Sequence, residues 1–132
     1  MIQIIHGGAS ADERGTVRYV NGFNFDGVRR FYTVQNKNRG FVRDWHGHYK
    51  QTIYAHTVSG SIIMGLINME DNTAHKYPLT GSEPAILLIP PGYASSFKSL
   101  TDDAIVLYFS TASLEESEAD SYRYPAKEWD IF

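Results

Sequence analysis

The run from Arg39 to Gln51, which reads RGFVRDWHGHYKQ, holds the densest set of residues that could do chemistry. Within it, His46 and His48 are two residues apart, and side chains at positions i and i+2 of a β-strand point to the same face. A neutral imidazole can take up or return a proton near neutral pH, and it can also bind a metal ion. The pair is therefore a candidate proton-transfer centre, and two structural histidines in a core or on a surface are the alternative interpretation.

The segments around this pair have the pattern of short strands separated by turn signals. Apolar, aromatic and β-branched runs recur at intervals of about 8–12 residues, which is typical of a sandwich or barrel. The Ser59-Gly60 pair predicts a tight turn that makes residues 52–67 a hairpin. A set of eight to ten strands is expected, including residues 3–6, 16–20, 28–34, 41–48, 52–58, 61–67, 75–79, 85–89 and 104–110.

The chain changes character after residue 112. Residues 113–120, SLEESEAD, predict one or two helical turns, with Ser113 as the cap and Glu116 completing a capping box. The tail at 122–132 is rich in aromatic residues, so we expect it to pack on the body of the molecule or on a second subunit. The prediction is one all-β domain over residues 1–132, with two antiparallel sheets rolled into a jelly roll and a short helical turn near the C-terminus.

Composition excludes several classes of protein. The chain has no cysteine, which excludes disulfides, thiolate metal sites and a cysteine nucleophile. A net charge of −3 offers no basic field for nucleic acid. The longest apolar run, Ala85 to Ile89, is far shorter than the roughly 20 residues that span a bilayer. Because the first residues, MIQIIHGG, lack the basic and apolar regions of a signal peptide, we expect a cytoplasmic location and no membrane partner.

The strand pattern and the His-x-His pair resemble the cupin superfamily. The cupin metal motif continues with a carboxylate and, after a Pro-x-Gly turn, a further histidine. Here Gln51 and Thr52 stand in place of the carboxylate, and Ser95 follows Pro90-Pro91-Gly92 in place of the histidine. A non-haem metal centre needs three or four imidazole or carboxylate ligands, so we expect no metal and no other cofactor. In a metal-dependent alternative, two further histidines could contribute: His56 and His75.

The remaining motifs resemble the cupins that act on nucleotide-linked keto sugars, the dTDP-4-dehydrorhamnose 3,5-epimerases and the dTDP-4-keto-6-deoxyhexose 3,4-ketoisomerases. Asp12-Glu13-Arg14-Gly15 looks like their Asp-x-Arg-Gly motif, whose arginine helps hold the diphosphate or the sugar. Arg43-Asp44-Trp45-His46 looks like the epimerase Arg-Gly-Leu-His, whose histidine is the catalytic base. Val106-Leu107-Tyr108 looks like the epimerase segment whose tyrosine is the general acid. The resemblance covers nearly the whole chain in separate patches.

Other patches point to the ketoisomerases or depart from both families. Residues 28–32 resemble the ketoisomerase Ile-Lys-Arg-x-Tyr, and residues 46–50 resemble its His-Ala-His-Lys. The epimerase glycine is replaced by Asp44, and Ala-His-Gly-Phe is replaced by residues 94–97, Ala-Ser-Ser-Phe. The epimerase aspartate that orients the catalytic histidine lies in a segment that this chain lacks, with Asp44 as a possible substitute. The stereochemical outcome is therefore left open.

The resemblance implies a set of catalytic roles. His46 would abstract the proton next to the ketone, and Tyr108 would return a proton from the opposite face. Lys50 or a tyrosine hydroxyl would hold the enolate oxygen. In a ketoisomerase, His48 would help to move a proton between two oxygens.

The substrate implied by the resemblance also needs binding groups. Arg14, Arg30 and Arg43 are the candidates for the diphosphate, because guanidinium groups bind phosphate oxygens in pairs. Arg43 lies three residues before His46, which is the wrong parity for a flat strand, so a bulge is required. Tyr32 is the first candidate for stacking on the base, with Tyr19 and Trp45 as others; Trp45 is expected to serve the core or a dimer contact instead.

The main hypothesis is a cofactor-free epimerase of a nucleotide-linked 4-keto-6-deoxyhexose, in bacterial deoxysugar, lipopolysaccharide or other polysaccharide synthesis. The alternatives are a 3,4-ketoisomerase, a metal-dependent cupin and a non-catalytic sugar-binding cupin. The expected partners are the nucleotide sugar and a second copy of the chain, with Arg14 reaching the neighbour's pocket. No residue pattern indicates which nucleotide or sugar is bound, or which carbon is inverted.

Overall fold

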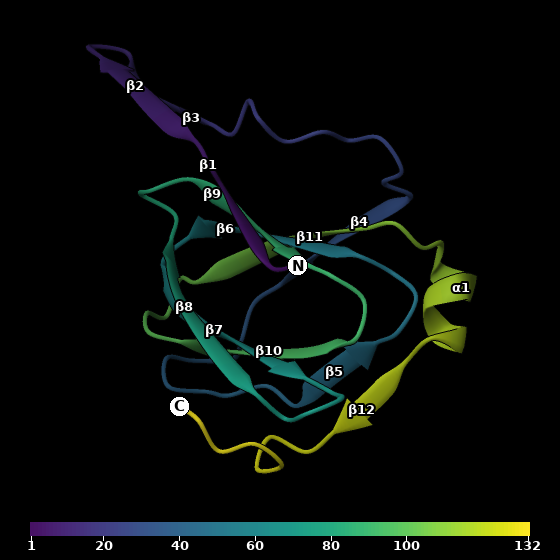
Figure 1. Ribbon diagram of the computed structural model, residues 1–132. Coiled ribbons are helices and arrows are strands. Elements are labelled where there is room, and N and C mark those ends of the chain that lie inside the picture. Colours follow the sequence, from purple (N-terminus) through teal and green to yellow (C-terminus); the bar gives the residue numbers. More distant parts are fainter.

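The computed structural model describes all 132 residues and contains two five-stranded antiparallel sheets that face each other (Figure 1). The first sheet has, in order, β1 (Gln3–His6), β9 (Ala85–Ile89), β6 (Ile53–Ser59), β11 (Ile105–Ser110) and β4 (Arg30–Val34). The second has β12 (Tyr122–Tyr124), β5 (Trp45–His48), β10 (Tyr93–Ser99), β7 (Ser61–Asn68) and β8 (Ala74–Thr80). The predicted all-β jelly roll is confirmed.

Alternation of side chains along the central strands builds the core between the sheets. In β6, Ile53, Ala55 and Thr57 are buried, and the residues between them are more exposed. In β11, Val106 and Tyr108 lie on the buried face with Ser110, as expected from the strand parity. The inward faces of the two sheets enclose one main cluster of buried side chains: Ile53, Ala55, Ile62, Met64, Leu66, Leu87, Ile89, Phe97, Ala104, Val106 and Tyr108.

The turn at Gly60 is not a hairpin, so the prediction for residues 52–67 is wrong. Strand β6 pairs with β9 and β11, and β7 pairs with β8 and β10, so the turn carries the chain from one sheet to the other. Gly60 has a φ of 71°, a left-handed conformation that glycine adopts most readily. A Cβ at this position would also lie 2.7 Å from the Cα of Ala104, so the corner is too tight for a larger residue.

Three strands were not expected from the sequence: β2 (Gly8–Asp12), β10 and β12. Strand β10, YASSFKS, has too few β-branched residues to stand out, although its small side chains pack well inside. The predicted strand at 41–48 is shorter than expected, because β5 begins at Trp45 and Val42 makes only an isolated bridge with Lys98.

Helix α1 (Leu114–Ala119) begins with the predicted capping box. The Ser113 hydroxyl accepts the Glu116 N–H at 3.2 Å, and the Glu116 carboxylate accepts the Ser113 N–H at 2.9 Å. No helix of the structure has the length and apolar character needed to cross a membrane.

The aromatic tail packs on the body of its own chain. Strand β12 pairs with β5, and the ring of Trp45, which is fully buried, stacks on that of Phe132 with centroids 5.9 Å apart. Trp129 meets Trp45 edge to face at 5.6 Å. Trp45 is therefore a core residue. Of the two locations expected for the tail, the body of the molecule and a second subunit, the structure shows the first.

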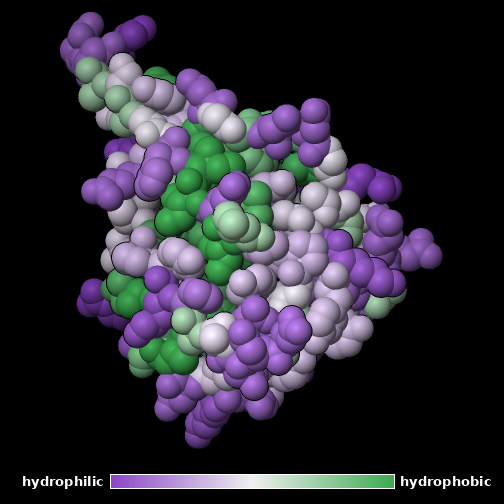
Figure 2. Space-filling model, in the orientation of Figure 1, coloured by the Kyte–Doolittle hydropathy of each residue, from purple (hydrophilic) through white to green (hydrophobic).

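A two-stranded arm, β2 and β3 (Gly15–Tyr19), projects from the body (Figure 1). All five residues of β3 are exposed, and Val17 keeps 66% of its surface accessible. Hydrophobic side chains also gather on the body near the base of the arm (Figure 2). The arm thus presents apolar side chains that nothing in the same chain covers.

Candidate active site

A cavity of about 320 Å³ lies between the two sheets, with β12 contributing to its lining. It is lined by residues from both sheets: Arg30, Tyr32, Val34, Arg43, Asp44, His46, His48, Ile53, Ser95, Ser96, Phe97, Tyr108 and Arg123. Six of the eight site residues expected from the sequence are among them: His46, His48, Tyr108, Arg30, Arg43 and Tyr32.

The two histidines enter the cavity side by side from β5. Their ring centroids are 4.4 Å apart, as expected for residues on one face of a strand. His46 Nε2 lies 2.6 Å from the hydroxyl oxygen of Ser121, and His48 Nδ1 lies 2.6 Å from the main-chain oxygen of Asp120. Each imidazole therefore has one nitrogen held by the chain.

The surroundings keep both imidazoles neutral. Burial lowers the pKa of His46 to about 4, with further lowering by His48, Arg123 and Arg30. Burial also lowers the pKa of His48, although the Asp120 carbonyl and carboxylate oppose this shift. At neutral pH both side chains are in the form that can accept a proton.

Tyr108 faces the histidines from the opposite sheet. Its ring stacks on that of Tyr32, the residue directly across from it on β4, with centroids 5.2 Å apart. Burial raises the pKa of Tyr108 well above its usual range, and the neighbouring Tyr32 adds to the effect. The phenol therefore stays protonated and can donate.

Three guanidinium groups give the cavity its positive charge. Arg30 lies over the Tyr32 ring at 4.7 Å and donates one hydrogen bond to the Ser117 hydroxyl, yet its Nε is buried without a partner. Arg43 donates to the Asn36 side chain at 3.4 Å. Arg123, directly across from His46 on β12, is exposed at the open side of the cavity. Such a cluster suits an anion with several oxygens.

No family model matches the sequence, and no curated protein matches it. Solved structures do match in fold. A dTDP-4-dehydrorhamnose 3,5-epimerase from Sulfolobus tokodaii has a TM-score of 0.80 at 23% identity, over 98% of this chain and 81% of that one. The chain has a cupin jelly-roll fold. A 3'-monoepimerase from Streptomyces bikiniensis with bound dTDP-quinovose has a TM-score of 0.78 at 17% identity, over 92% of this chain and 68% of that one. A 3,4-ketoisomerase from Thermoanaerobacterium thermosaccharolyticum with bound TDP has a TM-score of 0.75 at 21% identity, over 92% and 86%.

Arg43 reaches the cavity without the bulge that strand parity required. Strand β5 begins at Trp45, so Arg43 lies in the irregular segment before it. Because the alternation of a strand does not apply there, the side chain can turn toward the same cavity as His46.

Two of the expected site residues lie elsewhere. Strand β5 ends at His48, and the turn after it leads Lys50 to an exposed position beside a separate hollow against α1. Lys50 therefore does not share the histidine face, and the structure does not place it to hold an enolate in this cavity. Arg14 lies at the tip of the arm, where it pairs with Asp12 at 2.7 Å and both side chains are exposed. Within one chain Arg14 does not line the cavity.

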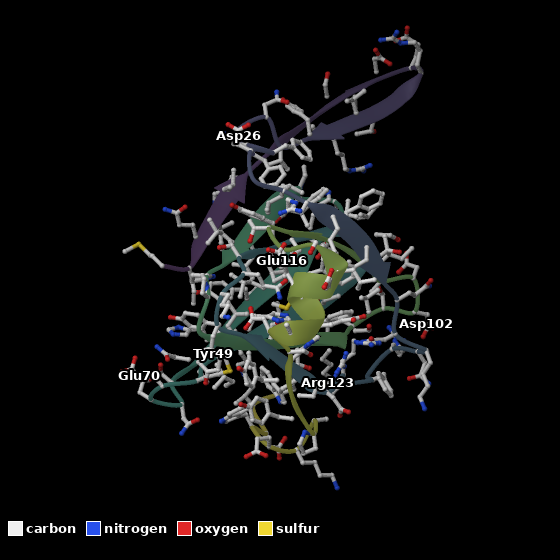
Figure 3. The ribbon with its side chains drawn as sticks, turned by 90° about the vertical axis from the view of Figure 1, so that its right-hand side faces the viewer. Asp26, Tyr49, Glu70, Asp102, Glu116 and Arg123 are labelled. Carbon is white, nitrogen blue, oxygen red and sulfur yellow. The ribbon has the colours of Figure 1, made fainter.

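Several residues of the site gave no signal in the sequence. Arg123, Asp120 and Ser121 come from the region around the short strand β12, whose pairing with β5 no local pattern predicts. Figure 3 looks onto α1 and shows Glu116 on the helix, with Arg123 on the segment below it. Asp44 lines the cavity, but its carboxylate accepts the Ala126 N–H at 2.9 Å, and the partner of His46 is Ser121 instead.

The donor set of the cavity does not fit the metal motif of the cupins. Ser95 lies directly across from His46 on β10, so a hydroxyl occupies the place of a further imidazole. His56 bonds the Ala85 carbonyl on the outward-facing side of β6, and His75 is exposed on β8. No group of three His, Cys, Asp or Glu side chains is arranged to hold a metal ion.

Proposed function

We propose that this cupin is a cofactor-free epimerase of a nucleotide-linked 4-keto-6-deoxyhexose. The observation that carries the proposal is the placement of His46 and Tyr108, which line one cavity from opposite sheets. Inversion of a carbon next to a ketone needs a base on one side of the sugar and an acid on the other. A neutral imidazole and a protonated phenol supply these two groups.

The first step is removal of the proton on the carbon beside the ketone by His46. The electron pair moves to the ketone oxygen and forms an enolate, which a hydrogen-bond donor must stabilise. Of the donors considered from the sequence, the tyrosine hydroxyl fits better than Lys50, because Tyr32 lines the cavity. Tyr108 then gives a proton to the opposite face of the carbon, and the centre is inverted.

The arginine cluster supports a nucleoside diphosphate as the group that carries the sugar. Arg30, Arg43 and Arg123 line the same cavity, and the buried Nε–H of Arg30 has no acceptor within the chain. Structures similar in fold contain dTDP-quinovose or TDP. The stacked pair Tyr32 and Tyr108 adds an aromatic surface next to these cations.

A 3,4-ketoisomerase is the second candidate, favoured by the closeness of the two imidazoles. Ketoisomerisation begins with the same proton abstraction and continues through an enediol, in which a proton must move between two oxygens. His46 and His48, with ring centroids 4.4 Å apart, are arranged to share that transfer.

We also propose that the protein acts as a homodimer in the cytoplasm, in deoxysugar and surface-polysaccharide synthesis. The exposed arm, with Val17 and Tyr19 uncovered, supports a second copy as its cover. Arg14 at the tip would then approach the neighbour's cavity. Sedimentation of the protein and of a Val17→Asp variant tests this arrangement, and a monomeric parent would contradict it.

The experiment that tests the function is proton NMR of dTDP-4-keto-6-deoxyglucose with the protein in heavy water. Deuterium at C3 or C5 with inverted couplings establishes the epimerase and identifies the carbon. A ketone that moves to C3 establishes the ketoisomerase. Binding without exchange supports a sugar-binding cupin. The absence of both binding and exchange contradicts the proposal for this sugar.

Two variants separate the acid from the base. His46→Asn should lower the rate of exchange roughly 10²–10⁴-fold, the usual contribution of general acid–base catalysis. Tyr108→Phe should keep the exchange but lose the inversion, because the proton can then return only from the histidine side. Inversion at the parent rate in Tyr108→Phe would exclude Tyr108 as the acid.

A further inference from the structure

The dipeptide Asp120-Ser121, which follows α1, contacts both histidines of the cavity. The hydroxyl oxygen of Ser121 lies 2.6 Å from His46 Nε2, and the main-chain oxygen of Asp120 lies 2.6 Å from His48 Nδ1. Two consecutive residues therefore hold two rings that come from alternate positions of β5.

The Asp120 carboxylate fixes the dipeptide against the turn that follows β5. It accepts the main-chain N–H groups of Tyr49 at 2.8 Å, Lys50 at 2.9 Å and Gln51 at 3.2 Å. Asp120 is 3% exposed, so this carboxylate is held by backbone donors and not by solvent. These three hydrogen bonds tie the dipeptide to the turn and hold the Asp120 carbonyl beside His48.

Two groups compete for His48 Nδ1, and they demand opposite protonation states. The Asp120 carbonyl can only accept, so it requires a proton on Nδ1. The Gln51 amide nitrogen can only donate, so it requires a bare Nδ1. The carbonyl is closer, at 2.6 Å against 3.0 Å, and the Gln51 amide nitrogen has another acceptor in Ser117 Oγ at 3.2 Å. The carbonyl therefore decides the tautomer.

We infer that Asp120 and Ser121 are positioning residues for the two imidazoles: Asp120 fixes His48 as the Nδ1–H tautomer with a bare Nε2, and Ser121 fixes the orientation of the His46 ring. The catalytic part of this inference rests on the proposed function: Ser121 acts on the base His46, and Asp120 acts on His48, which takes part in the ketoisomerase candidate. A serine hydroxyl both donates and accepts, so Ser121 holds the ring without choosing its tautomer. The carbonyl of Asp120 only accepts, so His48 is the imidazole whose proton-accepting nitrogen is determined in advance.

This arrangement supplies what the sequence could not locate, the partner that orients the bases. A second group that holds a base in one tautomer keeps nearly all of its population in the form that can accept the proton. Displacement of a base by about 1 Å can cost roughly 10²-fold in rate, so the partners should act on kcat more than on KM.

The test is nitrogen-15 NMR of the histidine rings in the free protein, which needs no substrate. The parent should show a proton-bearing Nδ1 and a bare Nε2 for His48. Asp120→Ala should give a mixture of the two tautomers and, where the reaction is the ketoisomerisation, lower kcat by about 10²-fold with little change in KM. Asp120→Asn keeps an acceptor oxygen and should restore part of both signals, and Asp26→Asn, at an exposed loop position, is the matched control.

The outcomes are decisive in either direction. A proton on Nε2 of His48 in the parent would overturn the assignment and make Gln51 the group that sets the tautomer. An unchanged spectrum in both Asp120 variants would reduce Asp120 to a structural clamp. For Ser121, loss of kcat in Ser121→Ala with recovery in Ser121→Thr supports the inference, and equal activity of all three contradicts it. If the parent has the stated tautomer but no isomerase activity, the proposed function fails and the tautomer assignment stands.

Discussion

The imidazole rings of His46 and His48 lie 4.4 Å apart, tilted by 49°, in a cavity that also contains three guanidinium groups. Burial is the main cause that lowers the pKa of either ring, and Arg30 and Arg123 lower it further. Two of the cations that suit a diphosphate therefore also help to hold the candidate bases in their neutral form. Binding of an anion and readiness to accept a proton are linked in this site.

The depressed pKa of His46 predicts a loss of stability in mild acid. In the unfolded chain this histidine takes up its proton near its ordinary pKa of 6.5, and in the folded chain burial, with the nearby cations, delays uptake to about 4. Its contribution to the free energy of unfolding is fully present above pH 6.5 and falls as the pH drops from 6.5 toward 4. Urea denaturation at several pH values across this range should show that the free energy of unfolding changes less with pH in His46→Gln than in the parent. His75→Gln, at an exposed position, should show the same change with pH as the parent.

Arg123 should contribute to nucleotide binding although no motif points to it. A hydrogen bond to a charged group is worth about 1.5–3 kcal/mol, so Arg123→Ala should weaken the binding of dTDP roughly 10–100-fold. Titration calorimetry measures the change. Lys127→Ala removes the same charge from an exposed position of the same tail and should leave the affinity close to that of the parent. Equal losses in both variants would mean that only net charge matters.

The corner at Gly60 should tolerate no side chain. Gly60→Ala places a Cβ against Thr101 and Ala104 in addition to forcing alanine into a left-handed conformation. Gly27 has a similar φ of 83° with open space around it, so Gly27→Ala incurs only the conformational cost of about 1–2 kcal/mol. Urea denaturation should show a clearly larger loss for Gly60→Ala. Equal losses would show that the corner relaxes.

The capping box of α1 should contribute measurably to stability. Ser113→Ala removes the acceptor for the Glu116 N–H, and loss of such a cap costs about 0.5–2 kcal/mol. Ser113→Thr keeps a hydroxyl oxygen and should lie close to the parent. Thermal unfolding of the three proteins measures the difference, and an alanine variant as stable as the parent would show that packing alone holds α1.

Local patterns predicted those features that depend on neighbours in sequence. The shared face of His46 and His48, the inward position of Tyr108 and the capping box of Ser113 all follow from strand parity or helix-end chemistry. These rules need only a few residues on either side. They also placed most of the strands and therefore the roll.

Features that depend on distant segments were missed for a physical reason. Nothing near Lys50 indicates that β5 ends at His48, because the carboxylate that organises the next turn belongs to Asp120. The role of Arg123 likewise depends on the pairing of β12 with β5. The sharp corner at Gly60 looks like a hairpin turn in sequence, and only the partners of β6 and β7 show that it joins two sheets.

The contacts of the histidines with Ser121 and Asp120 span 75 and 72 residues of chain, and this separation has a consequence for folding. During synthesis both imidazoles leave the ribosome long before their partners, and contacts between distant segments are slow to form. Until β12 arrives, β5 presents an unpaired edge on which another chain could add a strand. The segment that covers this edge also brings Asp120, Ser121 and Arg123 into place. Protection from aggregation and assembly of the site are therefore completed in the same folding step.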